Sequence, residues 1–225
     1  VAFACVAGTM LGAFNGALVA KLRLPSFLVT LGTMAAYRGA AQAAMGSESV
    51  KLPEGFKGLD QSLVLGVPWP LVIFALFAAI TGVLLHRTVF GRWVFALGTN
   101  ESASLYSGLP NDRTKIAVFA FTGLMAGVGA LLIDSRLAVA RHDLARGFEL
   151  DAITVAVVGG AAVTGGRGNV LGTVVALLLI VTIRTAMGVA NVKPEYQLTA
   201  IGALLVLAVL ADNLGRALAR RQVAA

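Results

Sequence analysis

Groups that bind metal ions or form disulfides are scarce in this sequence. Cys5 is the one cysteine, which excludes an internal disulfide, and its apolar surroundings favour a packing role. His86 and His142 are the two histidines. Because no cluster of cysteines and histidines exists, the sequence predicts no metal site.

Charged residues are also few. They make up 13% of the chain, about half the share found in an ordinary soluble domain, whereas hydrophobic residues make up 58%. Apolar runs of about 20 residues recur, and each would cross a bilayer as a helix. Acids deep within such a run are absent, which argues against a proton- or sodium-driven carrier. The sequence therefore predicts an all-α, polytopic helical membrane protein in contact with lipid.

About seven stretches of the chain are predicted to cross the membrane. One of them, 151–164, has 14 residues and would extend about 21 Å as a helix, which is too short for a plain crossing. Short, glycine-interrupted segments of this kind are typical of transport pathways. The predicted segments are 1–20, 25–45, 67–86, 115–134, 151–164, 169–189 and 196–211.

The longest polar interruption is the loop 86–115, which carries four Lys or Arg. A basic loop of this length between two crossings is expected to face the cytoplasm. With that orientation, the inside segments hold ten Lys and Arg and the outside segments hold six. The net charge of +7 then reflects membrane orientation, and we expect no nucleic-acid partner. The partly helical character of the loop predicts a docking surface rather than a bare connector.

Glycines recur every four residues within two of the predicted crossings. Because small residues let membrane helices approach closely, we expect these glycines to be helix-packing positions. They are Gly8, Gly12 and Gly16 in the first crossing, and Gly123 and Gly127 in 115–134.

Three polar residues within crossings leave alternatives open. Asn15 either forms a hydrogen bond between helices or contacts a substrate. Arg38 is costly in a membrane and must face protein or a water-filled cavity, so it either lies along a substrate path, snorkels, or forms a structural ion pair. Arg184 lies about one turn from the outer end of its helix, which favours snorkelling to the interface.

A glycine-rich stretch, VVGGAAVTGGRGNVLG, covers residues 157–172. It lacks the Gly-Lys-Ser/Thr of a phosphate-binding loop, and the spacing from Gly168 to Gly172 is one residue too long for a dinucleotide fingerprint. We interpret it as tight turns and close packing between membrane segments. No nucleotide-binding motif is present elsewhere.

Residues 1–20 are apolar from the start, without an initiator Met, a basic n-region or a cleavage site. This argues against a signal peptide, and we expect that an N-terminal part precedes the sequence. From the residues alone, the sequence predicts a membrane transporter subunit whose long inside loop receives force from a partner.

Four stretches carry a resemblance to a known family, and the resemblance extends over essentially the whole chain. They are GRWVFALGTNESASLYSGL (91–109), LGAFNGALVAKLRLPSFLVTLGTMAAYRG (11–39), GFELDAITVAVVGGAAVTGGRGNVLGT (147–173) and LLVLAVLADN (204–213). They resemble the membrane permeases of bacterial sugar-importing ATP-binding cassette (ABC) transporters, the ribose, xylose, rhamnose and autoinducer-2 group. The rhamnose type is the most similar.

This resemblance implies a multi-pass protein of the bacterial inner membrane with about ten crossings in the full chain. Residues 1–225 would form one permease domain, a transport subunit rather than an enzyme, without a cofactor of its own. A separate cytoplasmic subunit would bind and hydrolyse ATP. Further implied partners are a second permease copy or paralogue, and a periplasmic sugar-binding protein received by 46–66 and 135–151.

By the same resemblance, the loop 86–115 would hold a coupling helix that docks on the ATP-binding subunit. The positions that match the family pattern are Gly91, Arg92, Asn100, Glu101 and Gly108. Ser102-Ala103 departs mildly from the paired alanines that often follow the glutamate in relatives.

The cargo implied is a monosaccharide of the rhamnose or ribose type, or autoinducer-2. Neutral sugars are bound by hydrogen-bonding side chains along the path. Candidate path residues are Asn15, Thr30, Thr33, Arg38 and Asn191. An ion-coupled carrier without an ATPase is the alternative, and it requires uptake that depends on protons or sodium. A membrane-embedded enzyme, which would turn over substrate without translocation, is a third.

Overall fold

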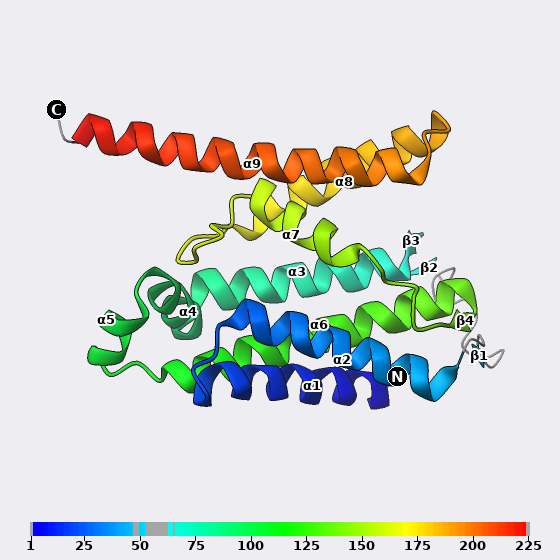
Figure 1. The fold of residues 1–225 in the computed structure, drawn as a ribbon, viewed down its shortest axis with the longest axis horizontal. Coiled ribbons are helices and arrows are strands. Elements are labelled where there is room, and N and C mark those ends of the chain that lie inside the picture. Colours follow the sequence, from blue (N-terminus) through cyan, green and yellow to red (C-terminus); the bar gives the residue numbers. More distant parts are fainter. Residues whose placement is uncertain (1, 47–49, 53–62, 65, 224–225) are drawn as a thin grey trace. The chain divides into compact units, whose positions relative to one another are not determined.

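The computed structural model describes residues 2–46, 50–52, 63–64 and 66–223, and describes side chains as far as residue 210. Nearly all of this part of the chain is helical (Figure 1), as predicted for an all-α membrane protein. The helices are α1 (Ala2–Lys21), α2 (Ser26–Met45), α3 (Trp69–Arg87), α4 (Val89–Thr99), α5 (Glu101–Tyr106), α6 (Asn111–Leu137), α7 (Phe148–Val158), α8 (Val170–Val189) and α9 (Pro194–Val223).

Helices occupy all seven segments that were predicted to cross the membrane. Within the described residues, four of them, α1, α3, α6 and α8, are both long and apolar enough for a crossing. The other three fall short for different reasons. Helix α2 has 20 residues, but Tyr37, Arg38 and Gln42 lower its apolar character. Helix α7 has only 11 residues, and the part of α9 whose side chains are described, Pro194–Leu210, is apolar but shorter than a full crossing.

Large apolar side chains cover the outside of these helices. Helix α3 has no buried residue at all among the described positions, although it is among the most apolar. Exposing such an apolar surface to water is unfavourable, whereas lipid hydrocarbon solvates it well. The backbone polar groups need no water, because a helix pairs them internally. The exposed apolar surface therefore agrees with a protein embedded in lipid.

The chain folds into two compact units, which are described separately. The first consists of Val1–Val94 and Glu101–Leu144, and the second of Phe95–Asn100 and Ala145–Ala225. Helix α4 therefore contributes its first turns to one unit and its last residues to the other.

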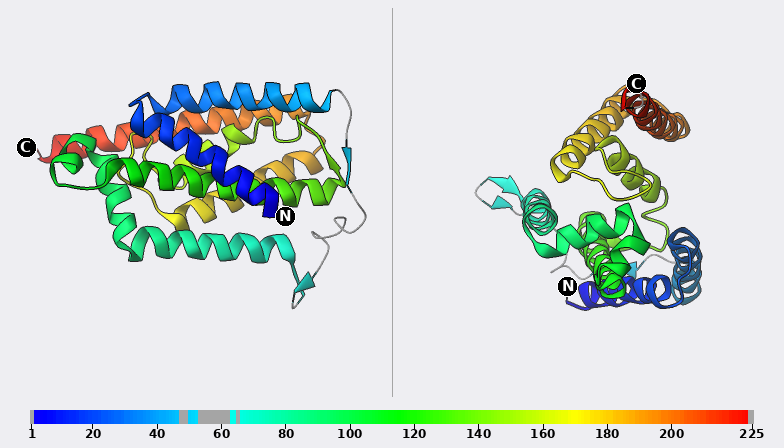
Figure 2. Two further views of the ribbon diagram at one scale, coloured as in Figure 1. Left: turned by 90° about the horizontal axis from the view of Figure 1, so that it is seen from below. Right: turned by 90° about the vertical axis from the view of Figure 1, so that its left-hand side faces the viewer.

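Packing of α1 against α6 dominates the first unit (Figure 2). Gly8 faces Gly123 and Gly127, and Gly12 faces Phe119 and Gly123, so the two helices run antiparallel. A methyl group added to Gly12 would overlap the carbonyl oxygen of Phe119, and its distance to the Cα of Gly123 would be only 3.0 Å. The backbones touch because these glycines carry no side chain.

Two pairs of short strands lie in the first unit. One pair joins the connection after α2 to the connection after α6, and the other precedes α3. β1 (Val50–Lys51) pairs antiparallel with β4 (Val139–Ala140), and Val50 lies opposite Ala140. β2 (Leu63–Val64) pairs with β3 (Val67–Pro68) just before α3. Because β1 follows α2 and β4 follows α6, the β1–β4 pairing brings the ends of α2 and α6 to the same side. This agrees with the topology predicted from the sequence, in which both connections are outside.

The second unit is built around α7, α8 and α9. Its core consists of Val155 from α7 and Ala176 and Ile180 from α8, with Val158 and Leu177 packed beside them. At the end of α7, a methyl group on Gly159 would lie 2.5 Å from the Cα of Thr173. The end of α7 and the beginning of α8 are thus held in direct backbone contact.

Candidate functional site

The corner between α3 and α4 depends on Thr88 and Gly91. Thr88 adopts an extended backbone (φ −110°, ψ 163°) that separates the two helices. Its hydroxyl donates to the carbonyl of Leu84 at 2.6 Å and accepts a hydrogen bond from the backbone N–H of Gly91 at 3.3 Å. Gly91 is buried, and a Cβ there would overlap the carbonyl oxygen of Leu85. Only glycine fits this corner, and Arg92, which follows it, is exposed.

Helix α5 is a single exposed segment of six residues between α4 and α6. Asn100 alone separates it from α4, and its backbone N–H still donates to the carbonyl of Ala96 at 3.1 Å. At the other end, the N–H groups of Gly108 and Leu109 donate to the carbonyls of Leu105 (3.0 Å) and Ser104 (3.1 Å). This is a Schellman motif, and Gly108 supplies the left-handed residue that it needs (φ +77°).

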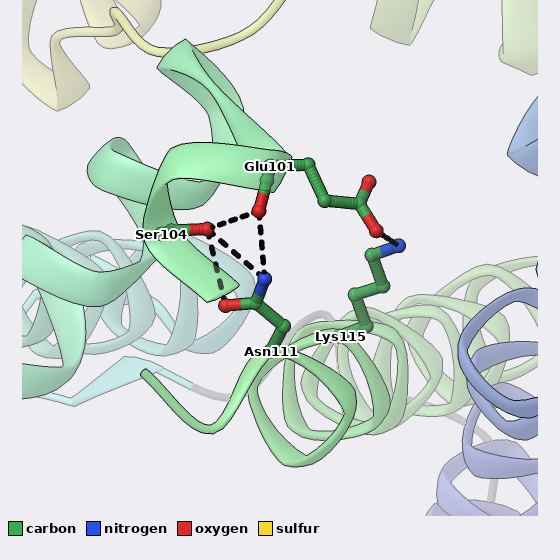
Figure 3. A network of polar contacts seen from close by, with 4 residues as sticks. All are labelled: Glu101, Ser104, Asn111 and Lys115. Carbon is green, nitrogen blue, oxygen red and sulfur yellow. Dashed lines mark hydrogen bonds and ion pairs between the residues drawn. The ribbon is translucent and has the colours of Figure 1, made fainter. Parts of the chain in front are cut away.

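A buried polar network attaches α5 to the beginning of α6 (Figure 3). The Asn111 side-chain amide donates to the carbonyl of Glu101 and to the hydroxyl of Ser104, both at 3.0 Å. The Ser104 hydroxyl also lies 2.8 Å from the carbonyl of Glu101 and 3.2 Å from the side-chain oxygen of Asn111. Ser104 is 4% exposed and Asn111 6%. Water is therefore excluded, and these hydrogen bonds hold α5 in one position.

An ion pair adds a second attachment. The carboxylate of Glu101 contacts the ammonium of Lys115 one turn into α6 (Figure 3). The Glu101 side chain is 60% exposed and that of Lys115 17%, so the Glu101 side chain remains largely open to solvent despite the ion pair. Two clefts of about 500 and 590 Å³ flank Glu101, and Arg23 lines both of them. Arg23 itself has a left-handed backbone (φ +52°) in the turn between α1 and α2.

The structure places the predicted path residues in two groups. Asn15 of α1 accepts a hydrogen bond from the Tyr37 hydroxyl of α2 at 3.3 Å, so it joins two helices. The hydroxyls of Thr30 and Thr33 donate to the carbonyls of Ser26 and Val29, both at 2.9 Å, within α2. Arg38 is half-buried on the same helix.

Asn191 belongs to the second unit. It is exposed in the turn between α8 and α9 and has a left-handed backbone (φ +54°). Its position there is typical of asparagine, which tolerates this conformation better than other residues with side chains.

Sequence reasoning missed two of the polar arrangements. Arg184 was expected to snorkel, but it donates to the carboxylate of Asp151 at 2.7 Å and links α8 to α7. The Ser104–Asn111 network was not foreseen either. A signal for the pair was present, since Asp151 begins one predicted segment at its outer end and Arg184 lies about one turn from the outer end of the next. Among the described residues, no three His, Cys, Asp or Glu side chains come together as a metal site.

The connection after β4 carries a two-pronged ion pair. The Nε and Nη2 atoms of Arg141 donate to the two carboxylate oxygens of Asp143 at 2.9 and 2.7 Å. This hydrogen bonding holds the pKa of Asp143 below its ordinary value, because it stabilises the ionised carboxylate. The other segment expected to receive a binding protein, 46–66, lies mostly outside the described residues.

Residues 1–209 match the family described as the permease component of branched-chain amino acid transport systems. The chain is 34% identical over 211 residues to the ribose import permease protein RbsC of Haemophilus influenzae, covering 92% of this chain and 65% of the relative. It is 36% identical over 217 residues to the L-arabinose ABC transporter permease protein AraH of Azospirillum brasilense, covering 96% and 64%. The Escherichia coli K12 autoinducer 2 import system permease protein LsrD is 34% identical over 223 residues, covering 96% and 67%.

No solved structure matches the chain significantly. The chain spans slightly less than two thirds of the length of the first of these relatives. The match nevertheless extends through α1, the α4–α5 segment and the glycine-rich stretch. The chain therefore belongs to this family of transport permeases, as a multi-pass protein of the inner membrane.

Proposed function

We propose that this chain is the membrane permease subunit of an ABC importer that carries a monosaccharide or a similar small polyol across the inner membrane. A separate cytoplasmic subunit binds and hydrolyses the ATP, and the permease itself catalyses no reaction and holds no cofactor. The names of its relatives support the cargo class, since they specify ribose, L-arabinose and autoinducer 2. The rhamnose type stays a prediction from the sequence.

The exposed helix α5 is the observation that carries the proposal. A permease whose conformation is changed by an ATP-binding subunit needs an exposed element to which that subunit binds. The element must also be held firmly enough to keep its shape when the bound subunit moves. Helix α5 has both properties, because it is exposed and because the buried contact of Ser104 with Asn111 fastens it to α6. A short helix fastened at its base transmits a displacement instead of absorbing it.

We assign the coupling surface to five residues. Glu101 and Arg92 present charge to the ATP-binding subunit, and Asn100 joins α4 to α5. Gly91 and Gly108 shape the two corners that hold the segment in place. The other proposed partners are a periplasmic sugar-binding protein and a second permease, either a copy of this chain or a paralogue. In this arrangement residues 1–225 act as one permease domain.

The proposed path uses neutral hydrogen-bonding groups together with Arg38. Sugars without charge are bound mainly by hydroxyls and amides, because these groups can both donate and accept hydrogen bonds. Thr30, Thr33 and Asn15 are the candidates on α1 and α2, and Asn191 is the candidate on the second unit. Thr30 and Thr33 face one side of α2 and can each still accept a hydrogen bond while donating to the backbone.

Co-purification tests the proposal. The full-length permease is co-expressed with its ATP-binding subunit, solubilised in mild detergent and captured by a tag on the permease. We expect the partner to co-purify, Glu101→Arg to release it, and Glu195→Arg, a matched change of an exposed glutamate at the other predicted side, to keep it. An ion-coupled carrier would retain no ATPase and would take up its cargo only with a proton or sodium gradient.

A further inference from the structure

Gly98, near the end of α4, touches the glycine-rich connection between α7 and α8. A methyl group on Gly98 would overlap the backbone nitrogen of Gly166 and would lie 3.1 Å from its Cα. Conversely, a methyl group on Gly165 would lie 2.9 Å from the carbonyl oxygen of Gly98. All these atoms belong to the second unit. The two segments therefore meet backbone to backbone, without an intervening side chain.

The connection between α7 and α8 that Gly98 contacts is a turn closed by backbone hydrogen bonds. Gly165 donates its N–H to the carbonyl of Ala162 at 2.9 Å, and Ala162 donates to the carbonyl of Arg167 at 3.0 Å. Gly165 and Gly166 have left-handed backbones (φ +86° and +78°), which glycine adopts without strain. These hydrogen bonds and angles keep the turn in one shape, so a displacement at Gly166 is passed on to both of its ends.

Both ends of this turn continue into a braced pair of helices. Near the turn, Gly159, the residue after α7, packs directly on Thr173 of α8. At the opposite end of the pair, Arg184 of α8 donates to Asp151 of α7 at 2.7 Å. The helices are therefore fastened at two places, and on the α7 side these places are eight residues apart, which is about 12 Å along a helix. We expect a pair fastened in this way to move together.

Helix α4 connects this contact to the proposed coupling helix. Gly98 precedes Glu101 by three residues, and the N–H of Asn100 remains bonded to Ala96, so the helical path continues up to α5. Thr99 is held as well, since its hydroxyl donates to the carbonyl of Phe95 at 2.8 Å. A methyl group on Gly166 would lie 2.5 Å from that hydroxyl oxygen. Along the chain, only Thr99 and Asn100 lie between Gly98 and the first residue of α5.

We propose that the contact of Gly98 with Gly165 and Gly166 transmits the displacement of α5 to the α7–α8 pair. Gly98 is then a positioning residue for transport, although it touches neither cargo nor the ATP-binding subunit. The inference rests on the proposed function, because it requires that α5 is moved by a partner. Transmission requires glycine at Gly98, Gly165 and Gly166. A Cβ at any of these positions would overlap neighbouring atoms and push α4 away from the connection between α7 and α8.

The first experiment changes one methyl group. In the full-length complex with its ATP-binding partner, Gly98→Ala is compared with Gly188→Ala, a glycine of α8 whose Cβ would meet nothing within 4 Å. We expect Gly98→Ala to retain the partner and ATP hydrolysis but to lower cargo uptake at least about tenfold. Gly188→Ala should transport normally. Unchanged uptake with Gly98→Ala would overturn the inference.

The second experiment needs no change at the contact. Arg167→Cys, at an exposed position next to Gly166, is made in a Cys5→Ala background and labelled with a maleimide reagent. We expect its labelling rate to differ between the nucleotide-free complex and the vanadate-trapped complex. An identical rate in both states would overturn the inference even if Gly98→Ala fails to assemble. Failure of the proposed function is recognised separately, because the unaltered permease would then retain no ATPase.

Discussion

The side chains of Ser104 and Asn111 meet in a buried contact, with the Asn111 amide 3.0 Å from the Ser104 hydroxyl. Both are nearly inaccessible, and both also bond to the carbonyl of Glu101. An exposed helix of six residues is not stable alone, because it is shorter than the length at which isolated helices persist. The position of α5 is therefore set by α6 through this contact and not by its own sequence.

Removing the Asn111 side chain should free α5. Asn111→Ala leaves the Ser104 hydroxyl and the Glu101 carbonyl buried with fewer partners, which costs about 1–3 kcal/mol. We expect faster hydrogen exchange and faster proteolysis across 100–110, together with reduced uptake. Asp112→Asn, an exposed neighbour, is the control and should behave like the unaltered protein. Equal protection of 100–110 in both variants would contradict this prediction.

The Glu101–Lys115 pair should matter little for the fold. Both partners retain solvent exposure, and pairs of this kind contribute at most about 1 kcal/mol. Lys115→Gln should therefore leave co-purification and uptake almost unchanged, whereas Glu101→Arg abolishes both. The combination of Glu101→Lys with Lys115→Glu restores the ion pair, but we expect it to remain inactive. Recovery of uptake in this double variant would show that Glu101 acts within the chain rather than on a partner.

Filling the glycine contact between α1 and α6 should destabilise the first unit. Gly12→Leu places a branched side chain against the backbone of Phe119 and Gly123, and overpacking of this kind costs about 1–3 kcal/mol or more. We expect a lower thermal transition in detergent and a lower yield. Gly39→Ala on α2, where a Cβ meets nothing within 4 Å, is the matched control. It should be neutral or stabilising by about 0.5–1 kcal/mol.

A double-mutant cycle tests the link between Asp151 and Arg184. Removing one partner leaves the other charge partly buried without a counter-charge. For a fully buried pair this costs about 3–5 kcal/mol of folding free energy. We expect a smaller cost here, because the Arg184 side chain is 36% and the Asp151 side chain 19% exposed. We expect Arg184→Ala alone to lower the thermal transition more than Arg184→Ala combined with Asp151→Asn. If the effects of the two changes simply add, the residues do not stabilise each other.

Much of the fold followed from local composition. The apolar runs placed α1, α3, α6 and α8 correctly, because a hydrocarbon solvent permits little besides a helix in a run of about 20 apolar residues. Helix α2 was harder, since Arg38 and Gln42 dilute the same signal. Within the loop 86–115 the residues indicated partial helix, but neither the boundary at Asn100 nor the attachment to α6 was visible.

Contacts between distant residues escaped prediction. Asp151 and Arg184 are 33 positions apart, and Ser104 and Asn111 are separated by a turn whose direction Gly108 decides. The glycine-rich stretch was predicted to pack closely against a membrane segment, but its contact with Gly98 carries no side-chain chemistry, so no pattern of residue types identified Gly98 as the partner.

The sequence by itself determined the membrane environment and the helical class of this protein, because apolar length acts locally and independently of packing. The orientation stays a prediction from the charge of the loops. Tertiary structure alone decided which glycines touch, which ion pairs form and what holds α5 in place. Those features depend on the relative position of backbones and on exclusion of water, and neither is a property of a segment taken alone.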